Sequence, residues 1–263
     1  MPSHTIPSPE VLQREILASH ARCRQYGIDP NMTSNPLQAH LSKAELAARR
    51  QQNKDFLDIA TTQIRELYRF VAGANFVVSL ADKDGYILDL IGDKGLLEEL
   101  TAGNLRPGYR WTEKDVGTSV ISLTLARKIP VQVNDNEHFC QRGHGHTCSA
   151  SPVFGEDDTL IGVIAMSGSA DQIHPHTLGM VITAARAIEN QMRIKKASKE
   201  LLLRNNYMNA IIESIDSGVM AVDKNGIISQ VNNHGKQILQ WDDELVGTPL
   251  SALEEVFLEA LDD

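Results

Sequence analysis

The densest group of chemically capable side chains is a run of histidines and cysteines between residues 138 and 148. It has the pattern His138-x-Cys140-x-x-x-His144-x-His146-x-Cys148. All five positions are even, so an extended strand would place them on one face. Imidazole and thiolate are ligands for zinc, iron or copper, and two thiols can form a reversible disulfide where their geometry allows it. The pattern makes Cys140, His144, His146 and Cys148 candidate ligands of a metal ion.

The same loop also fits a small-molecule pocket. Gly143 and Gly145 interrupt the run, so the segment need not be extended. Ligand sites are concave and mostly apolar, with a few polar groups that orient the ligand. Trp111 could form an apolar wall, although a packed core aromatic fits it equally well. Thr118, which follows Gly117, suits either a ligand contact or the N-cap of a helix.

Periodicity indicates an α+β fold around these residues. The runs 75–81 and 86–91, joined by a turn at 82–85, predict a β-hairpin. Strands followed by helices on one face suggest an antiparallel sheet with flanking helices. Three further strands are predicted at 130–133, 148–154 and 160–167, and short helices at 95–102 and 117–127.

Two long helices bracket this region. Ser42 and Glu45 form a capping-box pattern that opens a helix expected to continue to residue 72. Its apolar residues recur at three- and four-residue spacing, a pattern that favours packing on a partner helix. A second helix is expected from Pro175 to about Ile215, with a polar join at 195–199. That helix suits either a spacer or a dimerising signalling coil.

Composition excludes several classes of protein. The chain has 263 residues, 42% of them hydrophobic, which is ordinary for a globular protein. Of its net charge of −9, eight acidic residues stand after position 241 without a lysine or arginine among them. No basic face for a phosphate backbone is expected, and hence no direct contact with nucleic acid. The absence of long apolar runs and of an export signal, together with only three cysteines, favours the reducing cytoplasm and excludes a membrane location.

Several motifs follow one another in a fixed order: WTEKDVGTS at 111–119, PVQV at 130–133, HF at 138–139, TCSASP at 147–152 and LIGV at 160–163. This series resembles the GAF domain at the N-terminus of sigma-54-dependent transcriptional activators related to the regulators of acetoin and glycerol catabolism. SHARC at 19–23 and YGIDP at 26–30 resemble the N-terminal helix motif of that family. The family commonly has Asn where Ser119 stands and Gly where Ser122 stands.

A second resemblance concerns the C-terminal part of the chain. IDSGV at 215–219, the turn at 223–226 and LVG at 245–247 resemble the first part of a PAS domain. The two resemblances imply five regions in order along the chain. They are an N-terminal arm and short helix (1–41), a long helix (42–72), a GAF sensory domain (73–177), a helical, dimerising linker (178–206) and the N-terminal part of a PAS domain (207–263).

The resemblance also implies where a ligand binds. In a GAF fold the pocket lies between the sheet and the helices and loops on one face, which puts residues 105–150 around it. Their side chains offer aromatic walls and hydrogen-bonding groups, but they do not identify the ligand. The implied ligand-binding residues are Tyr109, Trp111, Thr118, Ser119, His138, Phe139, Cys148 and Ser149.

The function implied is that of a signal-sensing module. A small-molecule effector or a regulatory protein would bind the GAF domain of a homodimer and control a downstream ATPase and transcription. No Gly-x-x-x-x-Gly-Lys-[Ser/Thr] phosphate loop occurs in the chain, so the module itself is not expected to be an enzyme or to carry an assigned cofactor. Two alternatives remain. One is a metal- or redox-responsive sensor at the loop 138–148; the other is a GAF-type methionine sulfoxide reductase using Cys140 and Cys148, which would require a lowered thiol pKa.

Overall fold

The computed structural model describes residues 4–33, 35, 37–239 and 246–251. The chain divides into two compact units, Met1–Ile194 and Lys195–Asp263. The first unit contains a five-stranded sheet and the second a two-stranded sheet. The apolar residues of 250–261 have a helical spacing, but this segment lies almost wholly outside the described residues.

An antiparallel sheet of order β2-β1-β5-β4-β3 forms the centre of the first unit. β1 and β5 pair along their length, with Leu80 opposite Ile164, and β4 pairs with β5 so that Ala150 lies opposite Ala165. The hairpin and the three later strands expected from the sequence are all present. The strands are β1 (Phe76–Asp82), β2 (Ile87–Gly92), β3 (Val131–Asn134), β4 (His146–Phe154) and β5 (Leu160–Ser169).

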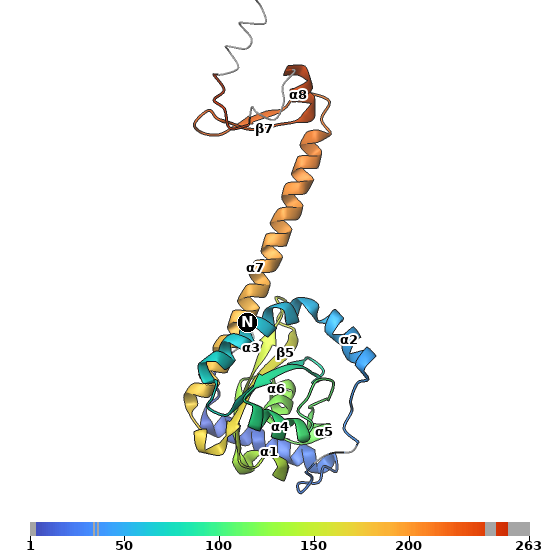
Figure 1. The fold of residues 1–263 in the computed structure, drawn as a ribbon, viewed down its shortest axis with the longest axis vertical. Coiled ribbons are helices and arrows are strands. Elements are labelled where there is room, and N and C mark those ends of the chain that lie inside the picture. Colours follow the sequence, from blue (N-terminus) through green and yellow to red (C-terminus); the bar gives the residue numbers. More distant parts are fainter. Residues whose placement is uncertain (1–3, 34, 36, 240–245, 252–263) are drawn as a thin grey trace, which may run out of the picture. The chain divides into compact units, whose positions relative to one another are not determined.

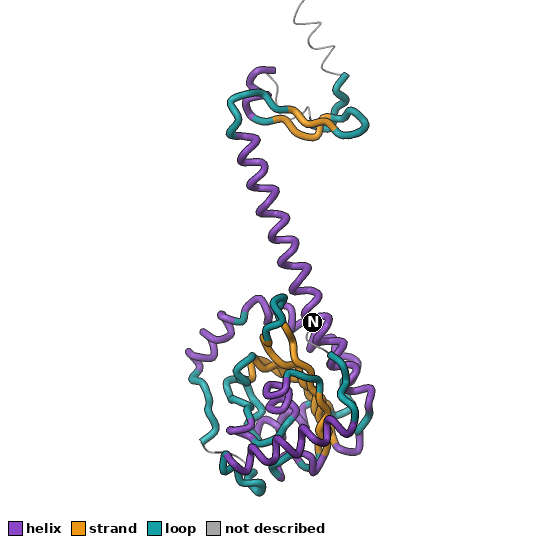
Figure 2. The backbone as a smooth tube through the Cα atoms, turned by 180° about the vertical axis from the view of Figure 1, so that it is seen from behind, coloured by secondary structure: helices purple, strands orange, loops and turns teal. Residues whose placement is uncertain are grey.

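Two helices cover one face of this sheet. The apolar side of α3 (Lys54–Val71) buries Ala60 and Ile64 in one cluster with strand residues and with Val181 of α7 (Pro175–Glu213). The cluster explains why the 3-4 spacing of apolar residues occurs here, since one stripe of each helix is removed from water. Figure 2 shows the strands of this unit enclosed by helices.

The predicted single helix over 42–72 is wrong. Two helices, α2 (Lys43–Gln52) and α3, occupy that stretch, and Asn53 separates them. The side-chain Nδ2 of Asn53 donates a 2.9 Å hydrogen bond to the carbonyl of Arg49, which satisfies a carbonyl at the end of α2. Asparagine competes with helical backbone bonds in this way. The predicted capping box between Ser42 and Glu45 is confirmed.

Shorter helices and the N-terminal helix lie over the other face (Figure 1). α6 (Val120–Arg127) contacts β3, β4 and β5, and buries Leu123 fully. α1 (Pro9–Gln25) contacts α5 (Glu113–Val116) and α6, and its Ile16 joins the same apolar cluster. α4 (Lys94–Ala102) completes this layer and buries Leu96.

The second unit is built around a short antiparallel pair, β6 (Met220–Val222) and β7 (Ile228–Val231), followed by α8 (Asn233–Leu239). The turn between the strands depends on Asp223, whose Oδ1 accepts hydrogen bonds from the backbone of Asn225 and Ile227. The fully buried Asn232 donates to the carbonyls of Ile212 and Ser217. These bonds attach the pair to the end of α7.

Within the residues that the structure describes, no helix is both long enough and apolar enough to cross a membrane.

Candidate ligand-binding site

A partly open cavity of about 80 Å³ lies in the first unit, between the helices of the α1 side and the sheet. Residues from α4, α5, α6, β4, β5 and the loop before β4 enclose it. Most of its surface is apolar, with a few polar atoms, as in small-molecule sites generally. The lining residues are Glu99, Leu100, Gly103, Leu105, Trp111, Val116, Thr118, Ser119, Val120, Ile121, His138, Cys140, Arg142, Gly143, His146, Cys148 and Ser167.

The connection between α5 and α6 forms one wall of the cavity. Gly117 has a φ of 72°, and a Cβ atom there would lie 3.0 Å from Phe139 and 3.1 Å from the sulfur of Cys140. Glycine is therefore required for both the backbone conformation and the close approach. Ser119, rather than Thr118, is the N-cap of α6, and its Oγ accepts a bond from the backbone of Ser122.

The hydroxyl of Thr118 does not cap a helix, which was one of the two roles considered for it. It lies 2.7 Å from the hydroxyl of Ser19 on α1. Thr118 therefore lines the cavity and at the same time contacts the helix that covers this side of the unit.

The loop before β4 is folded into turns instead of an extended strand. Two 3₁₀ turns, Asp135–Glu137 and Gln141–Gly143, break the two-residue period on which the shared face depended. Nδ1 of His138 is 3.0 Å from the carbonyl of Asp135, and burial lowers the pKa of His138 to about 4. Gly143 packs closely against the His138 side chain, since a Cβ atom at position 143 would lie 2.6 Å from Cβ and from Cγ of His138.

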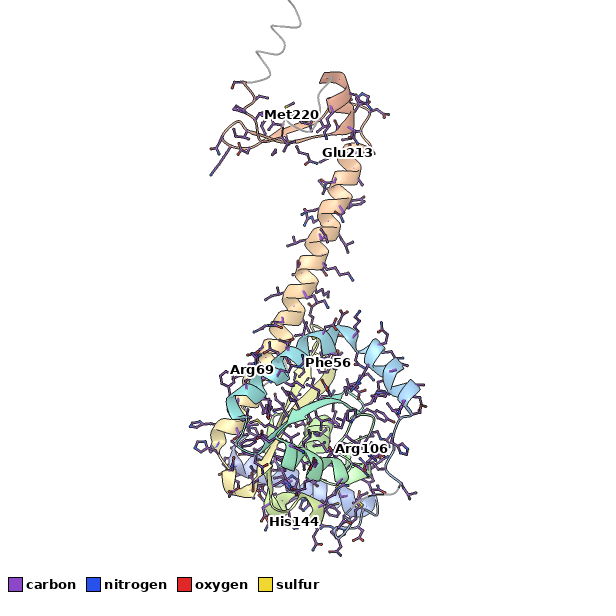
Figure 3. The ribbon with its side chains drawn as sticks, viewed as in Figure 1. Phe56, Arg69, Arg106, His144, Glu213 and Met220 are labelled. Atoms are coloured by element: carbon purple, nitrogen blue, oxygen red, sulfur yellow. The ribbon has the colours of Figure 1, made fainter. Side chains whose placement is uncertain are left out.

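The four candidate metal ligands are not brought together. Among the described residues, no group of three or more His, Cys, Asp or Glu side chains could hold a metal ion. The sulfur of Cys140 lies 3.4 Å from the carbonyl oxygen of Val116, and His144 is exposed at the surface of the unit (Figure 3). Cys140, His146 and Cys148 line the same cavity without forming such a group, and His144 lies outside the lining.

The thiols that face the cavity are held in the protonated form. Burial raises the pKa of Cys140 to about 11 and the pKa of Cys148 to about 11. The sulfur of Cys148 is 3.2 Å from the hydroxyl of Ser167, and both cysteines are free thiols. A thiol with a raised pKa is a poor nucleophile and a poor metal ligand, because both roles require the thiolate.

Two nitrogen atoms at the cavity have no protein partner. Nη2 of Arg142 and Nδ1 of His146 are buried and make no hydrogen bond. The Arg142 guanidinium lies over the ring of Trp111 at 5.3 Å, and its Nη1 is 3.4 Å from the carbonyl of Gly103. Nε2 of His146 is 3.2 Å from Oε1 of Glu99.

Comparison with known protein families identifies the unit that holds this cavity. The family model described as "GAF domain" matches residues 55–192, more than half of the chain. This chain belongs to the GAF domain family. A second model, described as "PAS fold", matches residues 206–256.

Several known relatives of the chain are transcriptional regulators. It is 34% identical over 230 residues to a signal-transduction and transcriptional-control protein of Clostridium beijerinckii, with 87% of this chain and 36% of the relative covered. It is 32% identical over 218 residues to the acetoin dehydrogenase operon transcriptional activator AcoR of Bacillus subtilis (strain 168), with 83% of this chain and 36% of the relative covered. The chain thus spans little more than a third of these relatives.

A solved structure has the same fold. The N-terminal region of DhaR, in the crystal structure of the E. coli DhaR(N)-DhaL complex, matches with a TM-score of 0.84 and 22% identity. The match covers 94% of this chain and 85% of that chain. The expected α+β fold, a GAF domain followed by a PAS-type segment, is confirmed.

Five of the eight residues predicted to bind ligand line the cavity of the GAF domain; they are Trp111, Thr118, Ser119, His138 and Cys148. Three do not. Tyr109 stacks on His40 with ring centres 5.1 Å apart, and Phe139 packs against Cys23 and Cys140. Ser149 follows Cys148 in β4, so it points to the opposite face of the sheet, because successive strand residues alternate.

Sequence reasoning did not assign Arg142, Glu99 or Ser167 to the site, although each lines the cavity. Arg142 offered a usable signal, since it is the one basic residue between His138 and His144 in a loop that was expected to surround the pocket. An arginine in such a segment is worth testing as an anion contact, because its fork of donors suits carboxylates and phosphates.

Proposed function

We propose that this chain is the signal-sensing module of a bacterial sigma-54-dependent transcriptional activator and that its GAF cavity binds a small metabolite in the cytoplasm. The observation that carries the proposal is the cavity, with two buried nitrogen atoms that have no partner in the protein. Such atoms are costly when unpaired, so a ligand that pairs with them is favoured. The relative that activates the acetoin dehydrogenase operon and the relative described as a signal-transduction and transcriptional-control protein support the same assignment.

The route for the signal starts at the wall of the cavity. Ser167 lines the cavity on β5, and β5 is followed by the 3₁₀ turn Ala170–Gln172 and then by α7. A ligand can shift α7 between two arrangements only by binding one of them more tightly. If the end of β5 lies differently in the two arrangements, contacts between the ligand and Ser167 give the ligand a different affinity for each. By its likeness to the family, the output is control of a downstream ATPase and of transcription.

We also propose that α7 forms a homodimer. In its C-terminal half it exposes apolar side chains at a seven-residue spacing, namely Ile194, Leu201 and Met208, and Ile215 continues the spacing just after the helix ends. A seven-residue apolar repeat is the pattern of helices that pair in a coiled coil. Pairing with a second copy would remove this stripe from water.

We propose that the chain also binds a regulatory protein. The N-terminal region of DhaR is in complex with DhaL, so a related fold takes a protein partner. For this chain, the partner would bind on the surface while the metabolite occupies the cavity.

The test is a cavity-blocking substitution in the native gene. Ser167→Leu would fill the cavity, whereas Ser169→Leu changes the same residue type on the same strand outside the lining. We expect Ser167→Leu to abolish the dependence of operon transcription on carbon source, and Ser169→Leu to retain it. Transcript levels across a panel of carbon sources measure both. A response that is unchanged in Ser167→Leu, with the protein still folded, would overturn the proposal.

A further inference from the structure

The cavity contains a cation that has no counter-ion in the protein. Arg142 remains protonated under all ordinary conditions, although burial lowers its pKa. No carboxylate of the described residues forms an ion pair with it, and its Nη2 is buried without a partner. The Trp111 ring lies over one face of the guanidinium. The carbonyl of Gly103 accepts a long hydrogen bond from Nη1. At least one donor therefore remains for a ligand.

Nδ1 of His146, the second unpaired atom, sets a second requirement for the ligand. Oε1 of Glu99 lies 3.2 Å from Nε2 of His146, and a carboxylate at that distance favours the tautomer with its hydrogen on Nε2, which leaves a lone pair on Nδ1. Nδ1 then accepts a hydrogen from a ligand hydroxyl. A ligand that satisfies both sites has an anionic group for Arg142 and a hydroxyl for His146.

Charge near the cavity is consistent with this requirement. Glu99 is the acidic residue of the lining, but its side chain is 64% exposed and it faces His146. Water screens an exposed carboxylate. The two cysteine thiols carry raised pKa values and stay neutral, and the lowered pKa keeps His138 neutral near pH 7. The guanidinium is therefore the main charge that a ligand meets inside.

Volume restricts the size of the ligand. At 10–15 Å³ for each water-sized group, a cavity of about 80 Å³ holds roughly five to eight such groups. A carboxylate with about three or four carbon atoms falls within this range. Its flat, two-oxygen end matches the fork of the guanidinium.

We propose that the GAF cavity binds a short-chain 2-hydroxycarboxylate, with its carboxylate on Arg142 and its hydroxyl on Nδ1 of His146. This inference rests on the proposed function and names the chemical class of its metabolite. The apolar wall formed by Leu100, Val120 and Ile121 would receive the carbon chain.

The experiment is a calorimetric titration of the 263-residue chain with matched small molecules. The buffer contains neither sulfate nor phosphate. Lactate carries both groups, propionate lacks the hydroxyl, and propane-1,2-diol and lactamide lack the negative charge. We expect lactate to bind, propionate to bind more weakly, and the two neutral compounds not to bind measurably.

Variants of the protein test whether lactate binding depends on Arg142. Arg142→Gln should weaken lactate binding roughly 10- to 100-fold, the value of a charge-assisted hydrogen bond. Arg142→Lys should be intermediate, since it keeps the charge and loses the fork. Arg106→Gln removes the same charge from an exposed arginine outside the lining and should bind as the parent does (Figure 3). His146→Phe should bring the affinity for lactate down to that for propionate.

Folding is checked by thermal unfolding without ligand. Because Arg142→Gln removes a half-buried charge that has no counter-ion among the described residues, its unfolding midpoint should equal or exceed that of the parent chain. Binding of the neutral diol as tight as that of lactate, or lactate binding unaffected in folded Arg142→Gln, would overturn the hydroxycarboxylate and leave the sensory function intact. Failure of every anionic and neutral compound to bind would also overturn it, whereas the transcription test with Ser167→Leu judges the sensory function independently.

Discussion

The hydroxyl of Ser19 lies 2.7 Å from the hydroxyl of Thr118, and this contact joins helix α1 to the wall of the ligand cavity. Ser19 also donates a 2.6 Å hydrogen bond to Oε1 of Glu113. Arg22, one turn further along α1, holds the same carboxylate with both Nε and Nη2. The cavity is therefore connected to the N-terminal helix through a largely buried polar network, in addition to its connection with α7 through β5.

Arg22→Ala should loosen α1. The Glu113 side chain is only 8% exposed, so removing its cation leaves a buried carboxylate with one hydroxyl partner. Breaking a buried pair costs several kcal/mol. The Arg22 side chain is 30% exposed, so we expect a loss of about 2 kcal/mol in unfolding free energy.

Urea unfolding measures that loss, and amide hydrogen exchange locates it. Exchange should accelerate within 9–25 and remain unchanged in the strands. Arg24→Ala, which alters an exposed arginine two residues away on the same helix, is the control. Unchanged exchange of α1 in Arg22→Ala would show that the network does not hold the helix.

Much of the fold could be predicted because its signals are local. The capping box at Ser42 and Glu45, the hairpin turn around Gly85 and the start of α7 at Pro175 are each set by a few neighbouring residues. The break at Asn53 was missed because asparagine is tolerated within helices, and its side-chain bond to the Arg49 carbonyl decides the outcome.

The site was harder to predict because it depends on which way side chains face. Every residue of β4 is buried, so its composition does not distinguish Cys148, which faces the cavity, from Ser149 on the opposite face. A strand covered on both faces lacks the polar alternation that reveals its orientation. Tyr109 was misplaced for another reason, since its stacking partner His40 lies in a distant part of the sequence.

Stability should decline on mild acidification because of His138. Burial lowers its pKa to about 4 from the ordinary 6.5, so between these values the unfolded chain binds a proton that the folded protein does not. Stability is therefore complete above about pH 6.5, decreases as the pH falls toward 4 and changes no further below it. The full effect is about 3 kcal/mol, of which about 2 kcal/mol falls between pH 6.5 and 5.

The measurement is urea unfolding of the chain and of His138→Asn across that range. Asparagine can donate to the Asp135 carbonyl, as Nδ1 of His138 does, but it does not titrate. His144 and His146, whose charges also act on His138, are retained in both proteins. The variant should lose about 2 kcal/mol less than the parent between pH 6.5 and 5. Parallel pH profiles would show that another group is responsible.

The cysteines should be unreactive in the folded protein. Burial raises the pKa values of Cys140 and Cys148 to about 11, and also raises that of Cys23. At pH 7.5 the thiolate fraction of Cys140 and of Cys148 is then smaller by about 10²-fold or more than in an unperturbed cysteine. Ellman's reagent should label the native chain slowly and all three thiols rapidly in denaturant. Rapid labelling of Cys140 without unfolding would revive the reductase hypothesis, and thiol-dependent reduction of methionine sulfoxide would establish it.

Dimerisation through α7 should depend on one stripe of the helix. Leu201 belongs to the seven-residue repeat with Ile194 and Met208, whereas Leu203 lies two residues away and therefore on another side of the helix. Both leucines are similarly exposed, at 62% and 58%, so the pair is a matched comparison. Leu201→Glu should weaken the dimer at least about 10-fold, because two apolar contacts are lost and two like charges are brought together.

Sedimentation equilibrium of the parent chain and the two variants measures this difference. Leu203→Glu should associate as the parent does, since its carboxylate would remain in water outside the seam. Equal weakening by the two substitutions would show that α7 associates without a defined stripe. A parent chain that is monomeric at high micromolar concentration would show that the exposed leucines serve a different contact, and the signal would then have to pass along a single α7 helix.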